Sequence, residues 1–389
     1  MRETIVVRLT GSGVGAIAVI LVAGERALQV VEKVTRRGEA LRGSVVAGLR
    51  SRKSPIGHTR IVNAAGEIVD DAVVVRVGDE QVELHVHGGT AVVAAVIRAV
   101  EEAGARQVDL EEAGRLGVLG RGIVGEVMMA LPLAKTMTAA KLIAAQVDEG
   151  LGRWAREWRR KAATDLWQLH AAAQWVLERS RSLRFLIEGG GPRVAIVGPV
   201  NAGKSTLANM LLGRQVAITS AVAGTTRDWV DAETVFVADD MQVAVTLVDT
   251  AGVRETADML ECESIKRTHQ QANDADVIVL LMDGSCPQTA EDRALLQRYL
   301  RSVVAINKSD LLISPSPPLP LSQAISISAR TGDGLDALMR TVLARLDLVE
   351  IRPDEPFAFT RRQCDILTAL SLTENTPQAI SLLDAMMAC

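Results

Sequence analysis

The stretch that decides the fold runs from Val194 to Ser205 and reads VAIVGPVNAGKS. Its first four residues are typical of a buried strand, and the glycine-containing loop after them leads into helix-forming residues. Glycines allow main-chain N–H groups to turn inward around phosphates, and the positive end of the following helix also attracts anions. In such a loop Lys204 reaches the β- and γ-phosphates and Ser205 holds magnesium. The stretch therefore predicts a P-loop within an α/β domain, with a mostly parallel sheet and helices on both faces.

Two further loops carry groups expected near the terminal phosphate. A predicted strand from Gln242 to Val248 delivers Asp249-Thr-Ala-Gly252, a Walker B carboxylate followed by the peptide that senses the γ-phosphate. Between this motif and the P-loop lies Gly224-Thr-Thr-Arg-Asp228. Its Thr226 is placed to complete magnesium coordination from a loop that orders with the triphosphate. The expected magnesium ligands are therefore Ser205 and Thr226.

The identity of the base is indicated by Asn307-Lys-Ser-Asp310, which follows a predicted strand from Val303 to Ile306. The carboxylate of Asp310 can accept hydrogen bonds from N1–H and from the exocyclic amine of guanine, and adenine offers neither donor there. A site that buries such a group rejects the wrong partner by about 10⁴-fold or more, because the group would be left unpaired. Ser328-Ala-Arg330, after a predicted strand from Ile325 to Ile327, supplies the last expected guanine-contacting loop. The predicted ligands are GTP and GDP.

The predicted GTP-binding residues come from five motifs that occur in order along the chain. They are Asn201, Ala202, Gly203, Lys204, Ser205, Thr206, Ser220, Ala221, Val222, Ala223, Gly224, Thr225, Thr226, Asp249, Thr250, Ala251, Gly252, Asn307, Lys308, Ser309, Asp310, Ser328, Ala329 and Arg330. Among them, Lys204 and Thr226 are expected to take part in catalysis.

The position after the Asp-x-x-Gly motif, where Ras-like proteins carry a water-orienting glutamine, is Val253. An aliphatic side chain cannot orient water, and a missing contribution of the arginine-finger type is typically worth about 10³–10⁵ in rate. Catalysis must then draw on other groups. Candidates are Asn201, whose side-chain oxygen can coordinate a monovalent cation, and Glu261. By position alone, Glu261 is an ordinary surface carboxylate opening a helix that runs on through Ile265.

The motifs together resemble those of the MnmE (also TrmE) family of tRNA modification GTPases. The matching segments are Gly198–Ser205, Ala223-Gly-Thr-Thr-Arg-Asp228, Asp249-Thr-Ala-Gly-Val-Arg-Glu-Thr256 and Asn307–Asp310. The resemblance implies that potassium takes the place of an arginine finger when two GTPase domains meet face to face, so that a homodimer is expected. It assigns the potassium ligands as Asn201, Ser220, Val222 and Thr225. It also implies that Glu261 orients the attacking water through a second water.

The same resemblance implies partners and a reaction. Family members work with a flavoprotein, MnmG, to add a carboxymethylaminomethyl group to the wobble uridine of certain tRNAs. Two alternatives stay open. One is a stand-alone switch similar to the ribosome-assembly GTPases Era and Der, although neither a KH domain nor tandem GTPase domains are visible. The other is a relic that binds GTP without a modifying role.

The pattern of short apolar segments, helical periodicity and breaks predicts four regions. They are an N-terminal α+β domain at 1–120, the first part of a helical domain at 121–190, the GTPase domain at 191–348 and a short C-terminal helical part at 349–389. Predicted N-terminal strands are Thr4–Leu9, Ala16–Val22, Ala72–Val77 and Val82–Val86. A helical pattern runs from Met137 to Glu188 and ends at the glycines before Pro192.

Outside the GTPase region the resemblance is fragmentary. His87-Gly-Gly89 looks like a family turn, and we expect His87 to be structural, because nothing near it in sequence suggests a nucleophile or an orienting acid. Ala18 stands at the family's folate-contacting arginine, so folate is a doubtful cofactor. The family's terminal Cys-x-Gly-Lys motif is not found before Cys389, which receives no catalytic role.

Composition narrows the other possibilities. A net charge of -4 argues against binding nucleic acid through a broadly basic surface. One dense basic cluster, between Arg153 and Lys161, is interpreted as a solvated helix face or, less favoured, as an RNA contact. The four cysteines show no CxxC pairing, and no apolar run approaches the roughly 20 residues of a membrane span. We therefore expect a cytoplasmic protein without membrane contact.

Overall fold

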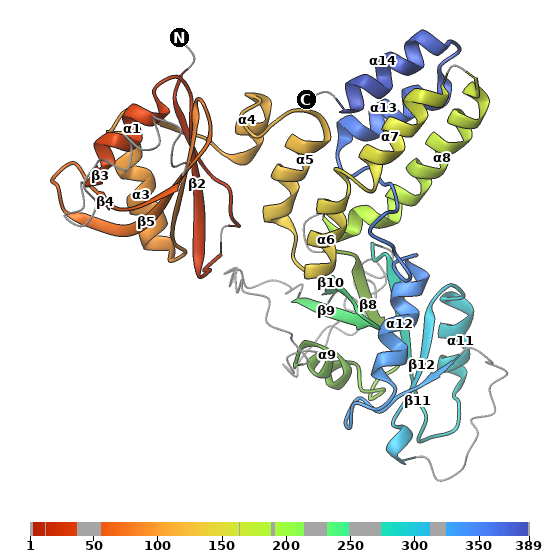
Figure 1. The fold of residues 1–389 in the computed structure, drawn as a ribbon. Helices are drawn as coiled ribbons and strands as arrows, with labels where there is room; N and C mark the ends of the chain where they lie inside the picture. Colours follow the sequence, from red (N-terminus) through yellow and green to blue (C-terminus); the bar gives the residue numbers. More distant parts are fainter. Residues whose placement is uncertain are drawn as a thin grey trace. The chain divides into compact units, whose positions relative to one another are not determined.

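The computed structural model describes residues 3–11, 13–36, 56–162, 164–187, 191–213, 232–248, 274–311 and 324–387. Its helices and strands, shown in Figure 1, form two compact units. The first unit contains the chain up to Leu133 together with the end of the last helix from Leu383, and the second contains most of the rest. The division into four predicted regions remains a prediction.

The first unit is built on a sheet whose described strands lie in the order β3-β4-β5-β6-β2-β1-β7. Its strands are β1 Ile5–Arg8, β2 Ile17–Ala23, β3 Thr35–Arg36, β4 Ile56–Val62, β5 Ile68–Gly78, β6 Gln81–His87 and β7 Arg106–Gln107. All described neighbours pair antiparallel except β1 and β7, which pair parallel. The four strands predicted in this region are confirmed as β1, β2, β5 and β6. Each end differs from the prediction by one residue, except that β5 begins at Ile68 rather than at Ala72.

Successive residues of a strand point to opposite faces, and β2 shows how this creates two cores. Its Ile20 and Val22 are buried with residues of helices α1 (Ala27–Val34) and α3 (Thr90–Glu102). Its Leu21 is buried on the other face with Ala113 of α4 (Leu110–Arg115). Helix α5 (Gly122–Ala130) follows α4. The first unit is therefore an α+β layer structure, as predicted.

The second unit contains a sheet with described strands in the order β13-β12-β11-β8-β10-β9. Their bounds are β8 Arg193–Val197, β9 Ala232–Ala238, β10 Met241–Val248, β11 Val277–Asp283, β12 Val303–Asn307 and β13 Ile325–Ser326. Pairing is parallel except between β9 and β10. Four residues of β8 and six of β10 are buried in unbroken runs, as expected for strands covered on both faces.

The helices of this sheet are α9 Lys204–Gly213, α11 Ala290–Arg298 and α12 Leu335–Arg345. Helix α11 begins where it does because Thr289 and Asp292 form a reciprocal capping box, in which each side chain accepts a hydrogen bond from the other's backbone N–H. Because β8, β10, β11, β12 and β13 run parallel, their carboxyl ends meet at one edge, where ligands bind in open α/β sheets. The predicted fold class is confirmed.

The remaining helices of the second unit are α6 Met137–Ala145, α7 Leu151–Lys161, α8 Leu166–Leu183, α13 Arg361–Leu372 and α14 Thr376–Met387, whose last turns belong to the first unit. The predicted helical stretch from Met137 is divided between α6 and α7 and again between α7 and α8. Gly150 precedes the first residue of α7 and Asp165 that of α8. Among the described helices, none is both long enough and apolar enough to cross a bilayer.

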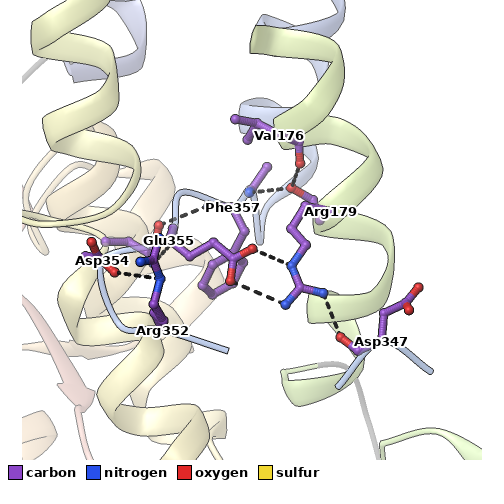
Figure 2. Close-up of polar contacts among 10 residues, drawn as sticks. Val176, Arg179, Asp347, Arg352, Asp354, Glu355 and Phe357 are labelled. Carbon is purple, nitrogen blue, oxygen red and sulfur yellow. Dashed lines mark hydrogen bonds and ion pairs between the residues drawn. The ribbon is translucent and has the colours of Figure 1, made fainter. Parts of the chain in front are cut away.

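The segment that follows α12 is fastened to α8, as Figure 2 shows. The guanidinium of Arg179 donates two hydrogen bonds to the carboxylate of Glu355, at 2.5 and 3.3 Å, and a third to the carbonyl of Asp347 at 2.6 Å. One residue on, the hydroxyl of Ser180 accepts from the N–H of Ala358 at 2.7 Å. Both ends of this connecting segment are thus held on one helix.

Candidate nucleotide site

The predicted P-loop lies between β8 and α9 and has backbone conformations that few residues tolerate. Gly203 has φ +94°, and a Cβ on it would lie 2.3 Å from Nδ2 of Asn307. At Gly198 a Cβ would lie 2.2 Å from the carbonyl oxygen of Leu281. Asn201 adopts the left-handed region with φ 63°, which asparagine enters more readily than most residues. Local geometry therefore requires glycine at 198 and 203 and favours asparagine at 201, in addition to what phosphate chemistry asks of the loop.

Lys204 is the first residue of α9, and its ammonium group points back along the loop. Its Nζ donates to the carbonyl oxygens of Gly198 at 3.0 Å and Pro199 at 2.8 Å. Burial lowers the pKa of Lys204 from its ordinary value, and the charge of Glu291 partly opposes this shift. A partly buried cation that donates to two carbonyl oxygens is suited to an anionic ligand such as a phosphate.

Asn307, at the end of β12, joins two loops through its side chain. It is buried, its Nδ2 donates to the carbonyl of Ala202 at 2.8 Å, and its Oδ1 accepts from the N–H of Ala329 at 2.8 Å. Ala202 belongs to the P-loop and Ala329 to the loop after β13. One amide therefore ties the phosphate end of the predicted site to its base end.

The base-reading carboxylate predicted at Asp310 is also fixed in place. Its Oδ1 accepts a hydrogen bond from the hydroxyl of Ser328 at 2.7 Å, and Ser328 is fully buried. The N–H of Ser309 donates to the carbonyl of Ile327 at 3.1 Å. The loop after β12 and the loop after β13 are therefore joined at the position where sequence reasoning placed guanine recognition.

One polar contact at this edge was missed by sequence reasoning. Nζ of Lys308 donates to Oδ2 of Asp283 at 2.5 Å, while the N–H and hydroxyl of Ser285 donate to Oδ1 at 2.9 and 2.6 Å. Burial tends to raise the pKa of Asp283, but the hydrogen bonds from Lys308 and Ser285 outweigh it, and the net pKa is lowered. The available signal was the acidic end of strand β11, which pairs in register with Asn307.

The predicted site residues that are described lie on three neighbouring loops of this edge. They are Asn201, Ala202, Gly203, Lys204, Ser205 and Thr206 after β8, Asn307, Lys308, Ser309 and Asp310 at and after the end of β12, and Ser328, Ala329 and Arg330 after β13. The others, Ser220–Thr226, Asp249–Gly252 and Glu261, lie outside the described residues. Strand β10 ends at Val248, immediately before Asp249.

In the first unit, the expectation that His87 lacks an orienting acid is wrong. Nδ1 of His87 lies 2.7 Å from Oδ1 of Asp70, whose other oxygen accepts from the His87 N–H at 2.8 Å. This hydrogen bond and the charge of Asp70 raise the pKa of His87. Ala18, the position of the expected folate contact, is fully buried in β2.

The basic cluster on α7 has partners of its own. Arg153 pairs with Asp354 at 3.4 Å, and Arg156 donates to two carbonyl oxygens in the turn after α6. Nζ of Lys161 lies 5.7 Å from the ring centroid of Trp158. The contacts of Arg153, Arg156 and Lys161 favour the interpretation of this cluster as a solvated helix face over its interpretation as an RNA contact.

Two family models match the chain and together cover more than half of it. One, the N-terminus of the GTP-binding protein TrmE, matches residues 4–112. The other, a 50S ribosome-binding GTPase, matches residues 193–308. The GTPase model covers the P-loop and reaches Lys308. The TrmE N-terminus model covers the sheet of the first unit.

Several curated relatives match along most of their length, and all are named tRNA modification GTPase MnmE. The protein of a Synechococcus species is 32% identical over 86% of this chain and 78% of its own length. That of a Ruegeria species is 30% identical over 97% of this chain and 90% of its own, and that of Methylorubrum populi is 34% identical over 88% and 80%. Matches of this extent include both units, which a stand-alone switch of the Era or Der type would not explain. The chain belongs to the MnmE family of tRNA modification GTPases.

Proposed function

We propose that the chain binds GTP, hydrolyses it to GDP and phosphate, and uses this cycle in tRNA modification. The observation that carries the proposal is the buried Asn307 amide, which joins the P-loop at Ala202 to the base-end loop at Ala329. Phosphate-binding and base-reading loops linked in this way fit one guanine nucleotide. Family membership supplies the tRNA role.

The P-loop supplies the first part of the mechanism. Its main-chain N–H groups and Lys204 hold the phosphates, and the lowered pKa of Lys204 reflects a partly buried cation that a phosphate would stabilise. Ser205, in the first turn of α9, is suited to ligate magnesium together with Thr226, and bound magnesium neutralises charge that develops on the phosphates. Asp249 is the proposed Walker B carboxylate, and the peptide that follows it, up to Gly252, is the proposed sensor of the γ-phosphate.

Binding and base choice are tested together by calorimetry with GDP and ADP on the wild type and on Asp310→Asn. We expect GDP to bind and ADP to bind at least about 10³-fold more weakly, since guanine alone satisfies the carboxylate. Asp310→Asn should lose most of this preference. Equal binding of ADP and GDP by the wild type would contradict the proposed function.

Potassium is the proposed substitute for an arginine finger. Asn201, which lies in the P-loop with φ 63°, would ligate the ion through its side-chain oxygen, together with Ser220, Val222 and Thr225, in a homodimer of GTPase domains. Glu261 would orient the attacking water through a second water. GTP turnover in potassium should greatly exceed turnover in sodium at equal ionic strength. Equal rates in the two salts would remove the role given to Asn201.

The tRNA role is proposed to require a flavoprotein similar to MnmG and to act on the wobble uridine in the cytoplasm. The test is nucleoside analysis of tRNA from a deletion strain that carries the wild-type chain or Lys204→Ala. We expect the carboxymethylaminomethyl group to be restored by the wild type only. Wobble uridines that are unchanged by the deletion would favour a relic without modifying activity.

A folate derivative is the third cofactor that the family resemblance implies. Ala18 is buried and uncharged where the family is expected to carry an arginine, so this chain lacks one cation for the folate carboxylates. Equilibrium dialysis of the wild type with a reduced folate tests this binding directly.

A further inference from the structure

We propose that Asp283 is a positioning residue for guanine-nucleotide binding, acting through Lys308. The inference rests on the proposed function, because Lys308 lies in the motif that reads the base. Asp283 belongs to none of the predicted nucleotide motifs, and it ends a different strand, β11, from the one that supplies Lys308.

Several contacts join the loop after β11 to the loop after β12. Asp283 and Asn307 are register partners at the ends of β11 and β12, and the N–H of Gly284 donates to the Asn307 carbonyl at 2.9 Å. From this common base the Lys308 side chain reaches back to Asp283, with Nζ 2.5 Å from Oδ2. The lysine side chain therefore runs from the loop after β12 to the end of β11. Lys308 belongs to the same motif as Asp310, the predicted guanine-reading residue.

The carboxylate of Asp283 is itself held in one orientation. Ser285 donates twice to Oδ1, from its N–H at 2.9 Å and its hydroxyl at 2.6 Å, which leaves Oδ2 directed to Lys308. The side chains of Asp283 and Lys308 are 16% and 28% exposed, so water screens the pair only in part. A carboxylate fixed by Ser285 can fix the lysine in turn.

The backbone of Lys308 is constrained as well. Its φ is 66°, a left-handed conformation that is unusual for lysine, and its carbonyl accepts from the N–H of Leu311 at 2.9 Å. A free lysine side chain loses rotamer freedom when it is ordered. Because Asp283 orders Lys308 before nucleotide arrives, binding avoids part of this loss.

The test is a double-mutant cycle with Asp283→Asn and Lys308→Met, measured by titration calorimetry with GDP. Lys308→Met keeps an unbranched apolar stem and removes the ammonium group. We expect Asp283→Asn to weaken GDP binding about five- to tenfold in the wild-type background and to have no further effect beside Lys308→Met. Equal losses in both backgrounds, or no loss in the first, would overturn the inference.

Two further measurements distinguish a positioning role of Asp283 from a general loss of folded structure. Asp283→Glu, which keeps the charge on a longer side chain, should restore part of the affinity, whereas Asp240→Asn, an exposed aspartate in the β9–β10 turn, should bind GDP like the wild type. The KM for GTP should rise with Asp283→Asn while kcat at saturating GTP stays within about twofold. A fall in kcat with unchanged KM would contradict a binding role.

The cycle remains informative if Asp283→Asn does not fold. Ser285→Ala then replaces it, because it removes the hydroxyl donor to Oδ1 and keeps the carboxylate and the backbone N–H donor. A loss of about twofold in GDP affinity is expected only where Lys308 is present. Unchanged affinity in Ser285→Ala would count against the inference. A wild type that binds no GDP would instead refute the proposed function, so the two failures are distinguishable.

Discussion

Gly203 is the residue where the geometry of the P-loop is least tolerant. Both its φ of +94° and the 2.3 Å approach of a Cβ to Asn307 forbid a larger side chain. We expect Gly203→Ala to cost about 1–3 kcal/mol of unfolding free energy, because the left-handed backbone would be strained, and to weaken GDP binding at least about tenfold. Denaturant unfolding and calorimetry measure the two effects.

A matched control is available ten residues on. Gly213 is the last residue of α9, and a Cβ there would meet nothing within 4 Å. Gly213→Ala should leave GDP binding unchanged and alter stability by less than about 1 kcal/mol. Similar losses in both variants would show that the effect at Gly203 is not specific to the loop.

His87 offers a pH-dependent test in the first unit. Its pKa is raised by the hydrogen bond and charge of Asp70, so folding favours the protonated ring. The resulting stabilisation is present below pH about 6.5, the ordinary histidine pKa, and is lost as the pH rises through the higher folded pKa. An NMR titration should show the His87 pKa falling toward the ordinary value in Asp70→Asn. Asp71→Asn, which removes a weaker interaction, should shift it less, and an unshifted pKa in Asp70→Asn would contradict the assignment.

These residues also show what sequence alone can reach. Lys204, Asn307 and Asp310 were predictable because each belongs to a short motif of consecutive residues that form a single loop. The partners Asp283 and Asp70 were not, because they lie 25 and 17 residues from Lys308 and His87 and meet them only through strand register. Side-chain pairing across a sheet leaves no local pattern in sequence.

Among the elements, the pairing of Arg179 with Glu355 holds the segment after α12 on α8 (Figure 2). The two side chains are 17% and 12% exposed, so loss of either leaves a charge in a poorly solvated place. We expect Arg179→Met to lower the unfolding free energy by about 1–3 kcal/mol, since three hydrogen bonds to charged or carbonyl oxygens are removed. Arg181→Met, an exposed arginine on the same helix, should change it by less than about 0.5 kcal/mol.

A cycle with Glu355→Gln identifies the pair as the cause. If the two side chains stabilise each other, the double variant should lose clearly less than the sum of the single losses. Additive losses would show that each side chain acts through other contacts, such as the one from Arg179 to the Asp347 carbonyl.

The elements themselves were predicted unequally. The buried strands β8, β10 and β12 were predicted to within one residue at each end, because an apolar run ends where a polar motif begins. The breaks between α6, α7 and α8 were not predicted. At the first break, fully buried Gln146 accepts from the N–H groups of Leu151 and Phe357, and the second of these contacts spans 211 residues. Tertiary contacts therefore determine where α6 ends and α7 begins, and helical periodicity in the sequence carries no information about such contacts.

At the scale of the whole molecule, the nucleotide sheet and the helices around it share one compact unit. Helix α6 is joined to the β9–β10 pair: the Gln242 N–H donates to the Thr138 hydroxyl at 2.9 Å, and Lys135 pairs with Glu233 at 2.6 Å. Strand β10 pairs with β8, which leads into the P-loop, so α6 contacts the neighbour of the strand that leads to the proposed phosphate-binding loop. Nucleotide binding is therefore expected to stabilise α6 as well as the sheet.

Hydrogen exchange with and without GDP tests this coupling. At a GDP concentration of 100 times Kd, binding adds about 2.7 kcal/mol to the unfolding free energy, which slows amides that exchange by opening of the whole unit about 100-fold. We expect this slowing in β10 and α6 but not at Leu84 in β6 of the first unit. Thr138→Val, which removes the hydroxyl acceptor, should reduce the effect in α6, whereas Thr138→Ser should preserve it. Equal slowing at Leu84 and Gln242 would mean that the two units open together and that α6 has no special part in the coupling.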